Sequence, residues 1–185
     1  IYTRVGFDDE HAAQGSRPTA GQEWPPRVTG GVTNAMVDWR REVLVIGVLK
    51  GALPFIADLV RKLTVPCTLD FMAVSSYGGS MHSSGVVRIL KDLDASIAGK
   101  HVLLVEDVID SSLTLSYLIK NLHSREPASL ELCTLMVKPG RRTLPVEPKY
   151  VGFEMPPTFV IGYGLDLDEQ FRQLPYIAAV NLPSE

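Results

Sequence analysis

Apolar and polar positions follow two patterns along the chain from residue 43 onward. Residues 43–48 (VLVIGV) form a continuous apolar run rich in β-branched side chains, which is typical of a strand buried on both faces. Over residues 52–63 (ALPFIADLVRKL) the apolar side chains recur at helical spacing, and Pro54 falls in the first turn, where a helix accepts proline. These patterns predict a strand followed by a helix.

The same alternation continues along the rest of the chain. Further strand-like runs occupy residues 67–77, 86–90, 101–105, 129–137, 150–154, 158–164 and 176–180. A second helix is expected over 112–122, with a core face made of Leu115, Leu118, Ile119 and Leu122. Strands that alternate with helices predict right-handed crossovers and a mostly parallel sheet.

The segment before residue 43 does not follow these patterns. Residues 15–31 (GSRPTAGQEWPPRVTGG) contain three prolines and four glycines, a composition typical of turns. One short helical pattern, NAMVDWRRE, covers residues 34–42. We therefore expect little regular structure here apart from that helix and a strand within the first five residues.

Composition narrows the class of protein. A chain of 185 residues with 45% hydrophobic content suits one globular domain, and a formal net charge of -3 argues against a nucleic-acid partner. Neither an apolar run long enough to span a membrane nor a signal peptide is found. Cys67 and Cys133 lie in apolar runs, which favours buried free thiols over a disulfide or metal pair. We expect a cytoplasmic protein without a membrane partner.

Charged residues follow the predicted strands. They are Lys50, Glu106, Asp107, Asp110, Lys138, Arg141 and Arg142. Ligands of open parallel sheets bind beyond the carboxyl ends of the strands, so these cations and acids are expected to converge on one crevice. Any one of them could be an ordinary solvated loop charge, but all of them fall at the same predicted edge.

The stretch EDVIDSSLT combines acids with hydroxyl residues. The hydroxyls lie where a turn meets the second helix, at Ser111, Ser112 and Thr114. With the free N–H groups of a helix start they make a phosphate site, although a plain serine N-cap is the alternative. Glu106 and Asp107 can bind a sugar diol or a divalent cation, and Asp110 can act as a general acid or base. This pattern favours a phosphosugar ligand. No Walker loop or dinucleotide-binding glycine motif is present.

The stretch VLLVEDVIDSSLTL closely resembles the phosphoribosyl-pyrophosphate (PRPP) signature of type I phosphoribosyltransferases. The surrounding motifs resemble the bacterial hypoxanthine-guanine phosphoribosyltransferases; they are GVLKGALPFIADL, DFMAVSSYG, SSGVVRILKDLD, KPGRR and VGFEMPPTFVIGYGLDLDEQFRQLPYI. The likeness runs from about Val43 to Leu182. It implies the α/β fold of that family, a mostly parallel twisted sheet flanked by helices with a small hood formed by the chain ends.

The resemblance also implies a reaction. Hypoxanthine or guanine would react with PRPP, in the presence of Mg²⁺, to give IMP or GMP and pyrophosphate. A xanthine-preferring or broad 6-oxopurine enzyme remains an alternative, as does a non-catalytic nucleotide-binding regulator with the same fold. The family forms dimers and tetramers, so a homodimer or homotetramer is expected.

Roles on the PRPP side of the site come from the same resemblance. Glu106 and Asp107 would bind the ribose hydroxyls directly or through the metal, and Asp110 would be the catalytic acid/base at the purine N7. The 5′-phosphate would lie against Ser111, Ser112, Leu113 and Thr114. Pyrophosphate would be held by Lys50, Gly51 and Arg172. The LKG turn often carries a non-proline cis peptide in this family.

The resemblance assigns the purine side as well. Lys138 would hydrogen-bond the purine O6, Phe159 would stack on the base, and the Val160 backbone would meet its Watson–Crick edge. Asp166 would assist Mg²⁺, alongside Glu106 and Asp107, and the exocyclic group of guanine. A mobile loop that excludes water would begin at Ser76 and Tyr77.

Two features depart from the family pattern. The family usually has glycine at the position of Ser112, so we expect an active enzyme with a somewhat raised KM for PRPP. Residues 1–42 match poorly and are assigned to an N-terminal segment that contributes to the hood. Residues 43–150 would form the PRPP-binding α/β core, and 151–185 a purine-binding and hood segment that completes the same domain.

Overall fold

The computed structural model describes residues 2–4, 42–76, 87–109, 113–138, 144–154 and 158–180. Its main sheet has six strands in the order β4-β3-β2-β5-β6-β7. In chain order these strands are β2 (Val43–Leu49), β3 (Cys67–Ser76), β4 (Val87–Lys91), β5 (His101–Ile109), β6 (Ser129–Val137) and β7 (Tyr150–Glu154). All neighbouring strands are parallel except β3 and β4 at one edge, so the predicted mostly parallel sheet is confirmed.

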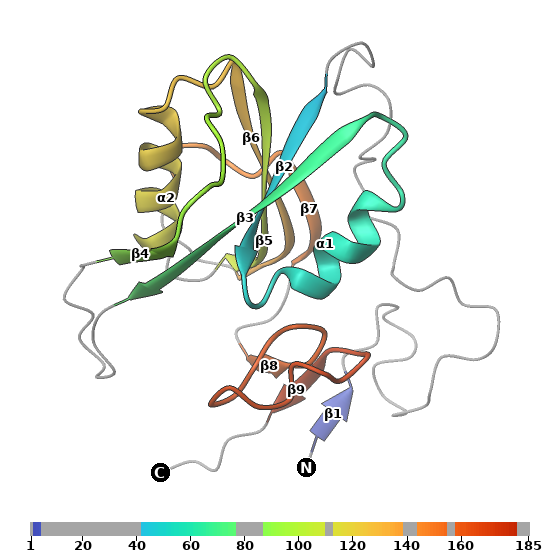
Figure 1. Ribbon diagram of the computed structural model, residues 1–185. Helices are drawn as coiled ribbons and strands as arrows, with labels where there is room; N and C mark the ends of the chain where they lie inside the picture. Colours follow the sequence, from blue (N-terminus) through green and yellow to red (C-terminus); the bar gives the residue numbers. More distant parts are fainter. Residues whose placement is uncertain are drawn as a thin grey trace.

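Two helices cover opposite faces of this sheet, as Figure 1 shows. Helix α1 (Leu53–Val60) packs with Val43 and Val45 of β2 in one apolar cluster. Helix α2 (Leu113–His123) packs with Leu44 and Ile46 of the same strand in a second cluster. Successive side chains of a strand point to opposite faces. Strand β2 is therefore buried on both sides, as its continuous apolar run predicted.

The helices follow their predicted patterns closely. The core face of α2 is Leu115, Leu118, Ile119 and Leu122, as predicted, and all four are buried. Helix α1 carries its proline in the first turn, as predicted, but ends at Val60. The predicted helix to residue 63 was therefore too long, and residues 61–62 form a turn instead.

Strand β5 is longer than its apolar run. The sequence predicted its end at residue 105, but the strand continues to Ile109 and includes Glu106 and Asp107. Its pairing with β2 stops at Val105, whereas its pairing with β6 continues to Ile109. The backbone hydrogen bonds of one neighbour extend the strand through two acids, which a prediction from apolar residues misses.

A second, three-stranded sheet has the order β1-β9-β8, with both pairings antiparallel. Its strands are β1 (Tyr2–Arg4), β8 (Phe159–Ile161) and β9 (Ala178–Val180), so both ends of the chain contribute to it. In Figure 1 it lies below the carboxyl end of β2 and the start of α1. The strand expected in the first five residues is present; a hood over the site and the three-part division of the chain remain predictions.

Two further expectations concern cysteines and membranes. Both cysteines are free thiols, but only Cys133 is buried, and Cys67 is half-buried. Burial raises the pKa of the Cys133 thiol to about 12, so it stays protonated and unreactive. Among the described residues no helix is long and apolar enough to cross a membrane. The helix expected over residues 34–42 lies almost wholly outside the described residues.

Candidate active site

The turn that follows β2 lies against the carboxyl end of β5. The peptide bond between Leu49 and Lys50 is cis, as the resemblance led us to expect. A Cβ atom at Gly51 would overlap the carboxylate of Asp107. Glycine is therefore the residue that lets the turn approach this acid so closely.

The loop between β8 and β9 packs onto the same turn. Gly164 has a φ of +98°, and a Cβ atom there would overlap the carbonyl oxygen of Gly51. The hydroxyl of Tyr163, its neighbour, donates a hydrogen bond of 2.6 Å to Oδ2 of Asp58 in α1. The 162–176 loop is thereby fixed to both the turn and the helix, far from either in sequence.

Arg172 is the cation at the centre of this loop. Its Nη1 donates to the Gly164 carbonyl at 2.8 Å, and its Nη2 lies 2.9 Å from Oδ1 of Asp166. Its buried Nε has no hydrogen-bond partner among the described residues. A buried N–H without a partner is unfavourable.

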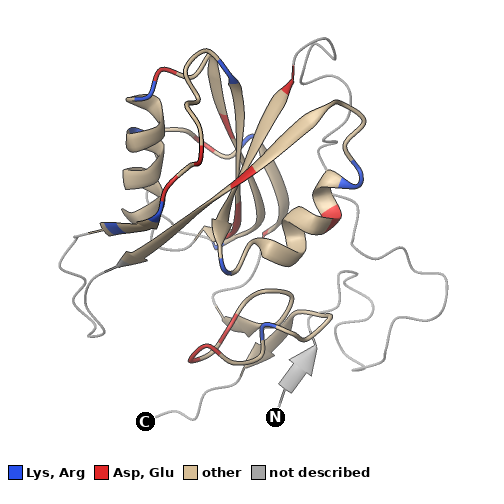
Figure 2. Cartoon of the chain, viewed as in Figure 1, with Lys and Arg blue, Asp and Glu red and all other residues tan. Residues whose placement is uncertain are grey.

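Glu169 joins Arg172 to Lys50. Its Oε2 lies 2.7 Å from Nζ of Lys50, and its Oε1 lies 3.4 Å from Nη2 of Arg172. Its backbone N–H donates to Oδ2 of Asp166 at 2.8 Å. Figure 2 shows this mixture of charges on the β8–β9 loop, beside the basic position after β2.

Two adjacent acids in β5 lie near these groups, and of them Glu106 is buried and Asp107 half-buried. Burial, and then the charge of Asp107, hold the pKa of Glu106 well above its ordinary value. Burial also raises the pKa of Asp107, although the Val108 N–H and the charge of Arg172 oppose the shift. The hydroxyl of Thr134 in β6 lies 2.9 Å from the Met136 carbonyl of its own strand and 3.4 Å from the Asp107 carbonyl of β5. Such acids gain from a cation or from hydroxyl donors, which is the property predicted for a ribose or metal site.

The residues predicted to bind a purine lie on two other elements. Lys138 directly follows β6, is half-buried, and donates its backbone N–H to the Ile109 carbonyl at 3.1 Å. Phe159 opens β8 with 37% of its surface exposed, whereas its neighbour Val160 is buried. A partly exposed ring beside a buried strand can offer a face for stacking.

The structure thus brings Lys50, Gly51, Asp107, Asp166 and Arg172 together, as the sequence predicted. Leu113 and Thr114 open helix α2, and Ser76 is the last residue of β3. The remaining predicted residues, Asp110, Ser111, Ser112 and Tyr77, lie outside the described residues, as do Arg141 and Arg142.

Two residues that matter to the site were missed. Glu169 stands three residues before Arg172, in the motif LDLDEQFRQL, and Gly164 ends the motif GYG. The second carries a usable signal, because paired glycines indicate positive φ or close backbone approach. The first carries none, since its partner Lys50 is 119 residues away.

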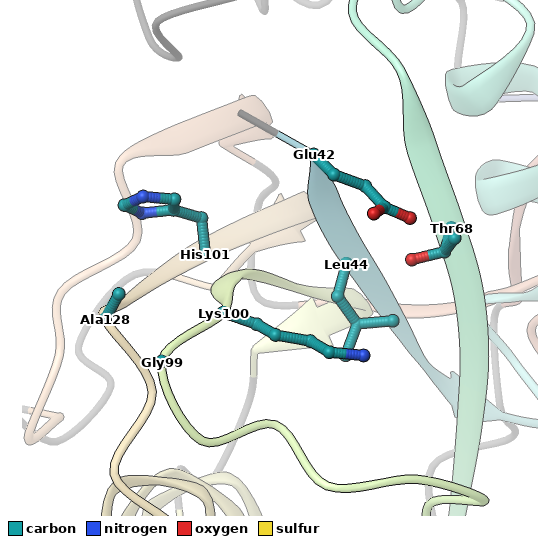
Figure 3. A pocket seen from close by; sticks show the side chains of 7 residues that line it. All are labelled: Glu42, Leu44, Thr68, Gly99, Lys100, His101 and Ala128. Carbon is teal, nitrogen blue, oxygen red and sulfur yellow. The ribbon is translucent and has the colours of Figure 1, made fainter. Parts of the chain in front are cut away.

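A separate pocket lies at the opposite, amino-terminal edge of the main sheet. It has a volume of about 370 Å³ and is lined by Glu42, Leu44, Thr68, Gly99, Lys100, His101 and Ala128, as Figure 3 shows. None of the predicted site residues is among them. The chemistry predicted for this chain therefore belongs to the carboxyl edge.

Comparison with known proteins defines the class. The family model of the phosphoribosyl transferase domain matches residues 31–168. The chain therefore belongs to the phosphoribosyl transferase domain family.

Particular relatives lie within that family. The chain is 54% identical over 148 residues to the hypoxanthine-guanine phosphoribosyltransferase of Mycobacterium avium, covering 80% of this chain and 73% of that protein. It is 52% identical over 137 residues to the hypoxanthine-guanine phosphoribosyltransferase of Bacillus subtilis, covering 74% and 76%. A crystal structure of such an enzyme from Bacillus anthracis superposes with a TM-score of 0.71 at 46% identity, covering 76% of this chain and 83% of that one.

Proposed function

We propose that this chain is a purine salvage enzyme that transfers the 5-phosphoribosyl group of PRPP to N9 of hypoxanthine or guanine, giving IMP or GMP and pyrophosphate. The main support is structural: at the carboxyl edge of the sheet the half-buried acid Asp107 lies against Gly51, and the charge of Arg172 lowers its pKa. Relatives at 54% and 52% identity carry the name of this activity. They favour it over a xanthine-preferring enzyme and over a non-catalytic regulator.

Charge development explains the cations. Breaking the bond between C1′ and the pyrophosphate oxygen leaves positive charge on the ribose and negative charge on the leaving group. Lys50 and Arg172 stabilise the leaving pyrophosphate. Asp107, with Glu106, faces the ribose hydroxyls, where negative charge also favours the ribosyl cation.

Binding of Mg²⁺ is assigned to Asp107 and Asp166, with Glu106 nearby. Both aspartates lie near Arg172, because Oδ1 of Asp166 is 2.9 Å from its Nη2 and the charge of Arg172 lowers the pKa of Asp107. Among the described residues no three metal-ligating side chains gather in one place. A pair of carboxylates suits Mg²⁺, which binds one or two of them and completes its shell with water and substrate phosphates. When bound, the ion offsets the charge that builds on pyrophosphate.

The remaining predicted site residues are assigned to the 5′-phosphate and to the purine base. Helix α2 has no acid in its first turn, so its start suits the 5′-phosphate, held by Ser111, Ser112, Leu113 and Thr114. Lys138 donates to O6, Phe159 stacks on the ring, and the Val160 backbone meets its edge. Asp110 moves the proton at N7, and the loop from Ser76 and Tyr77 excludes water.

The decisive experiment is steady-state turnover with PRPP and Mg²⁺ against hypoxanthine, guanine, xanthine and adenine in separate assays. We expect hypoxanthine and guanine to react and adenine to fail. Asp110→Asn should lower kcat by about 100-fold or more. Nucleotide binding without turnover of any base would overturn the proposed activity and favour the non-catalytic regulator.

Three further proposals can be tested on the same preparation. Ser112→Gly should lower the KM for PRPP, and an unchanged KM would show that this serine has no effect.

The chain should form a homodimer or homotetramer in size-exclusion chromatography with light scattering; a strict monomer would contradict this. A cytoplasmic location is part of the proposal and rests on the same salvage role.

A further inference from the structure

Glu169 occupies an unusual place between two cations. Its two carboxylate oxygens are divided between them, with Oε2 at 2.7 Å from Lys50 and Oε1 at 3.4 Å from Arg172. One cation comes from the turn after β2 and the other from the β8–β9 loop, so the carboxylate bridges two separate parts of the fold. The nearest cation, Lys50, also holds the pKa of Glu169 below its ordinary value.

The two acids that contact Arg172 differ in exposure. The side chain of Asp166 is 29% exposed and also accepts a backbone hydrogen bond, which ties it into the loop. The side chain of Glu169 is 64% exposed, and its Lys50 partner is 68% exposed. An exposed ion pair of this kind is weak and exchanges readily with other anions. Asp166 therefore orients Arg172, whereas Glu169 is a displaceable partner.

We propose that Glu169 occupies the pyrophosphate position on Lys50 and Arg172 in the ligand-free protein, and that pyrophosphate or the pyrophosphate group of PRPP displaces it. Both are oxygen anions that bridge the same two cations. Glu169 is thus a positioning residue: it keeps the cations together before binding, and its return favours product release. It also lowers the affinity for pyrophosphate, because binding must first break these contacts.

The variant Glu169→Gln tests this role, because it keeps the size of the side chain and removes its charge. The dissociation constant of pyrophosphate, measured by calorimetry at fixed Mg²⁺, should fall by about 2- to 5-fold, the range of one exposed ion pair. In the assay the KM for PRPP and the inhibition constant of pyrophosphate should both fall, while kcat stays equal or decreases as release slows. An unchanged or weaker affinity for pyrophosphate would overturn the proposal.

Asp168→Asn is the matched control. Asp168 is the preceding residue, is exposed, and contacts neither cation among the described residues; its φ of 52° is one that asparagine tolerates. The variant makes the same change in net charge without touching the pair. Its affinity for pyrophosphate should stay within about 1.5-fold of the parent, since exposed charges are well screened. An equal tightening in both variants would assign the effect to net charge and reject the specific contact.

Because this proposal rests on the assignment of Lys50 and Arg172 to pyrophosphate, Lys50→Ala belongs in the experiment. It should weaken pyrophosphate binding, and Glu169→Gln should have a smaller effect in that background. Unchanged binding in Lys50→Ala would reject the pyrophosphate site itself. Weaker binding in Lys50→Ala without tightening in Glu169→Gln would reject only the role of Glu169. Thermal unfolding of each variant verifies that it is folded.

Discussion

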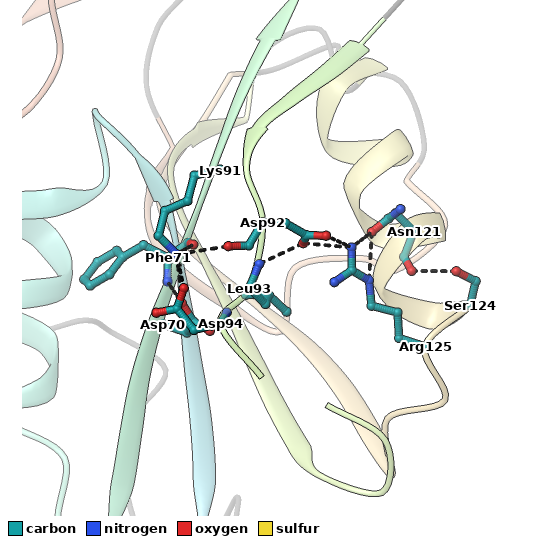
Figure 4. Close-up of polar contacts among 9 residues, drawn as sticks. All are labelled: Asp70, Phe71, Lys91, Asp92, Leu93, Asp94, Asn121, Ser124 and Arg125. Atoms are coloured by element: carbon teal, nitrogen blue, oxygen red, sulfur yellow. Dashed lines mark hydrogen bonds and ion pairs between the residues drawn. The ribbon is translucent and has the colours of Figure 1, made fainter. Parts of the chain in front are cut away.

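Two acidic regions of this molecule differ in how well the fold stabilises their carboxylate charges. The first, here called the Asp70–Arg125 network, comprises Asp70, Lys91, Asp92, Asp94 and Arg125, and is drawn in Figure 4. In it Nζ of Lys91 lies 3.3 Å from Oδ1 of Asp70 and 3.1 Å from Oδ1 of Asp94. Nη2 of Arg125 lies 2.8 Å from Oδ1 of Asp92. Each acid in this network has a cation at hand.

The pKa values reflect this pairing. Burial alone would raise the pKa of Asp70, but backbone hydrogen bonds from Asp94 and Phe71, together with Lys91, hold it below its ordinary value. Burial likewise acts against Asp92, and the Leu93 N–H and Arg125 lower its pKa overall. The charged forms are therefore stabilised, and the network ties β3, the segment after β4 and the end of α2 together.

The second region is the candidate active site, where burial dominates. The pKa values of Glu106 and Asp107 are both raised, because burial outweighs the few donors that oppose it. Acids that are unfavourable in the free protein become favourable once a ligand supplies cations or hydroxyls. The difference teaches that one region contributes stability, whereas the other gives up stability for binding.

The largest expected effect comes from Asp107→Asn. The variant keeps the shape of the side chain and removes a half-buried charge whose desolvation the fold only partly offsets. We expect kcat/KM for PRPP to fall by about 100-fold or more, while the thermal midpoint stays equal or rises. Steady-state kinetics measure the loss of activity, and thermal unfolding measures the change in stability. A variant that is less stable and still active would remove the contrast between the two regions.

Asp70→Asn should lower the stability of the protein and leave its activity nearly unchanged. An asparagine cannot accept both the Lys91 interaction and the Asp94 N–H, which lies 2.8 Å from Oδ2. We expect a loss of about 1 kcal/mol in the free energy of unfolding, with activity within about 2-fold of the parent. Urea denaturation gives the first quantity. Activity lost in proportion to stability would mean that the network also shapes the site.

Between neutral pH and 3.8, the stability difference from the parent should change with pH for Asp107→Asn and stay constant for Asp70→Asn. Asp107 has a raised pKa in the folded chain, so its unfavourable charge is present above that raised pKa and fades as pH falls through it toward the ordinary value of 3.8. The advantage of Asp107→Asn should shrink over that range. Asp70 has a lowered pKa, so its contribution is present above 3.8 and is lost only below it. Urea midpoints between neutral pH and that value test both; parallel pH curves for the two variants would contradict the pKa directions.

Arg125→Ala should have the smallest effect. Its partner Asp92 is 51% exposed, so the pair is well solvated, although Nε of Arg125 also donates to Asn121 at 3.1 Å. We expect the free energy of unfolding to fall by about 0.5 kcal/mol, with less difference in high salt. If the free energy of unfolding fell as much as in Asp70→Asn, the contacts of Arg125 near the end of α2 would be the main stabilising part of the network.

Local pattern alone determined much of this protein. The continuous run at 43–48 and the helical spacing at 115–122 fixed which faces are buried, because side-chain direction follows backbone period. The EDVIDSSLT stretch predicted the chemistry at the end of one strand, since acids and helix-start hydroxyls have few other shared uses. These features depend on residues close together in sequence, and the structure confirms the elements and faces among the described residues.

Only the tertiary structure decided the details of the site. Strand β5 runs through Glu106 and Asp107 because β6 continues to pair with it. Gly51 and Gly164 meet because both lack a side chain where two loops touch. Glu169 finds Lys50 across 119 residues. Each of these depends on a partner that is distant in sequence, and no local pattern encodes which distant residue the folded chain will bring into contact.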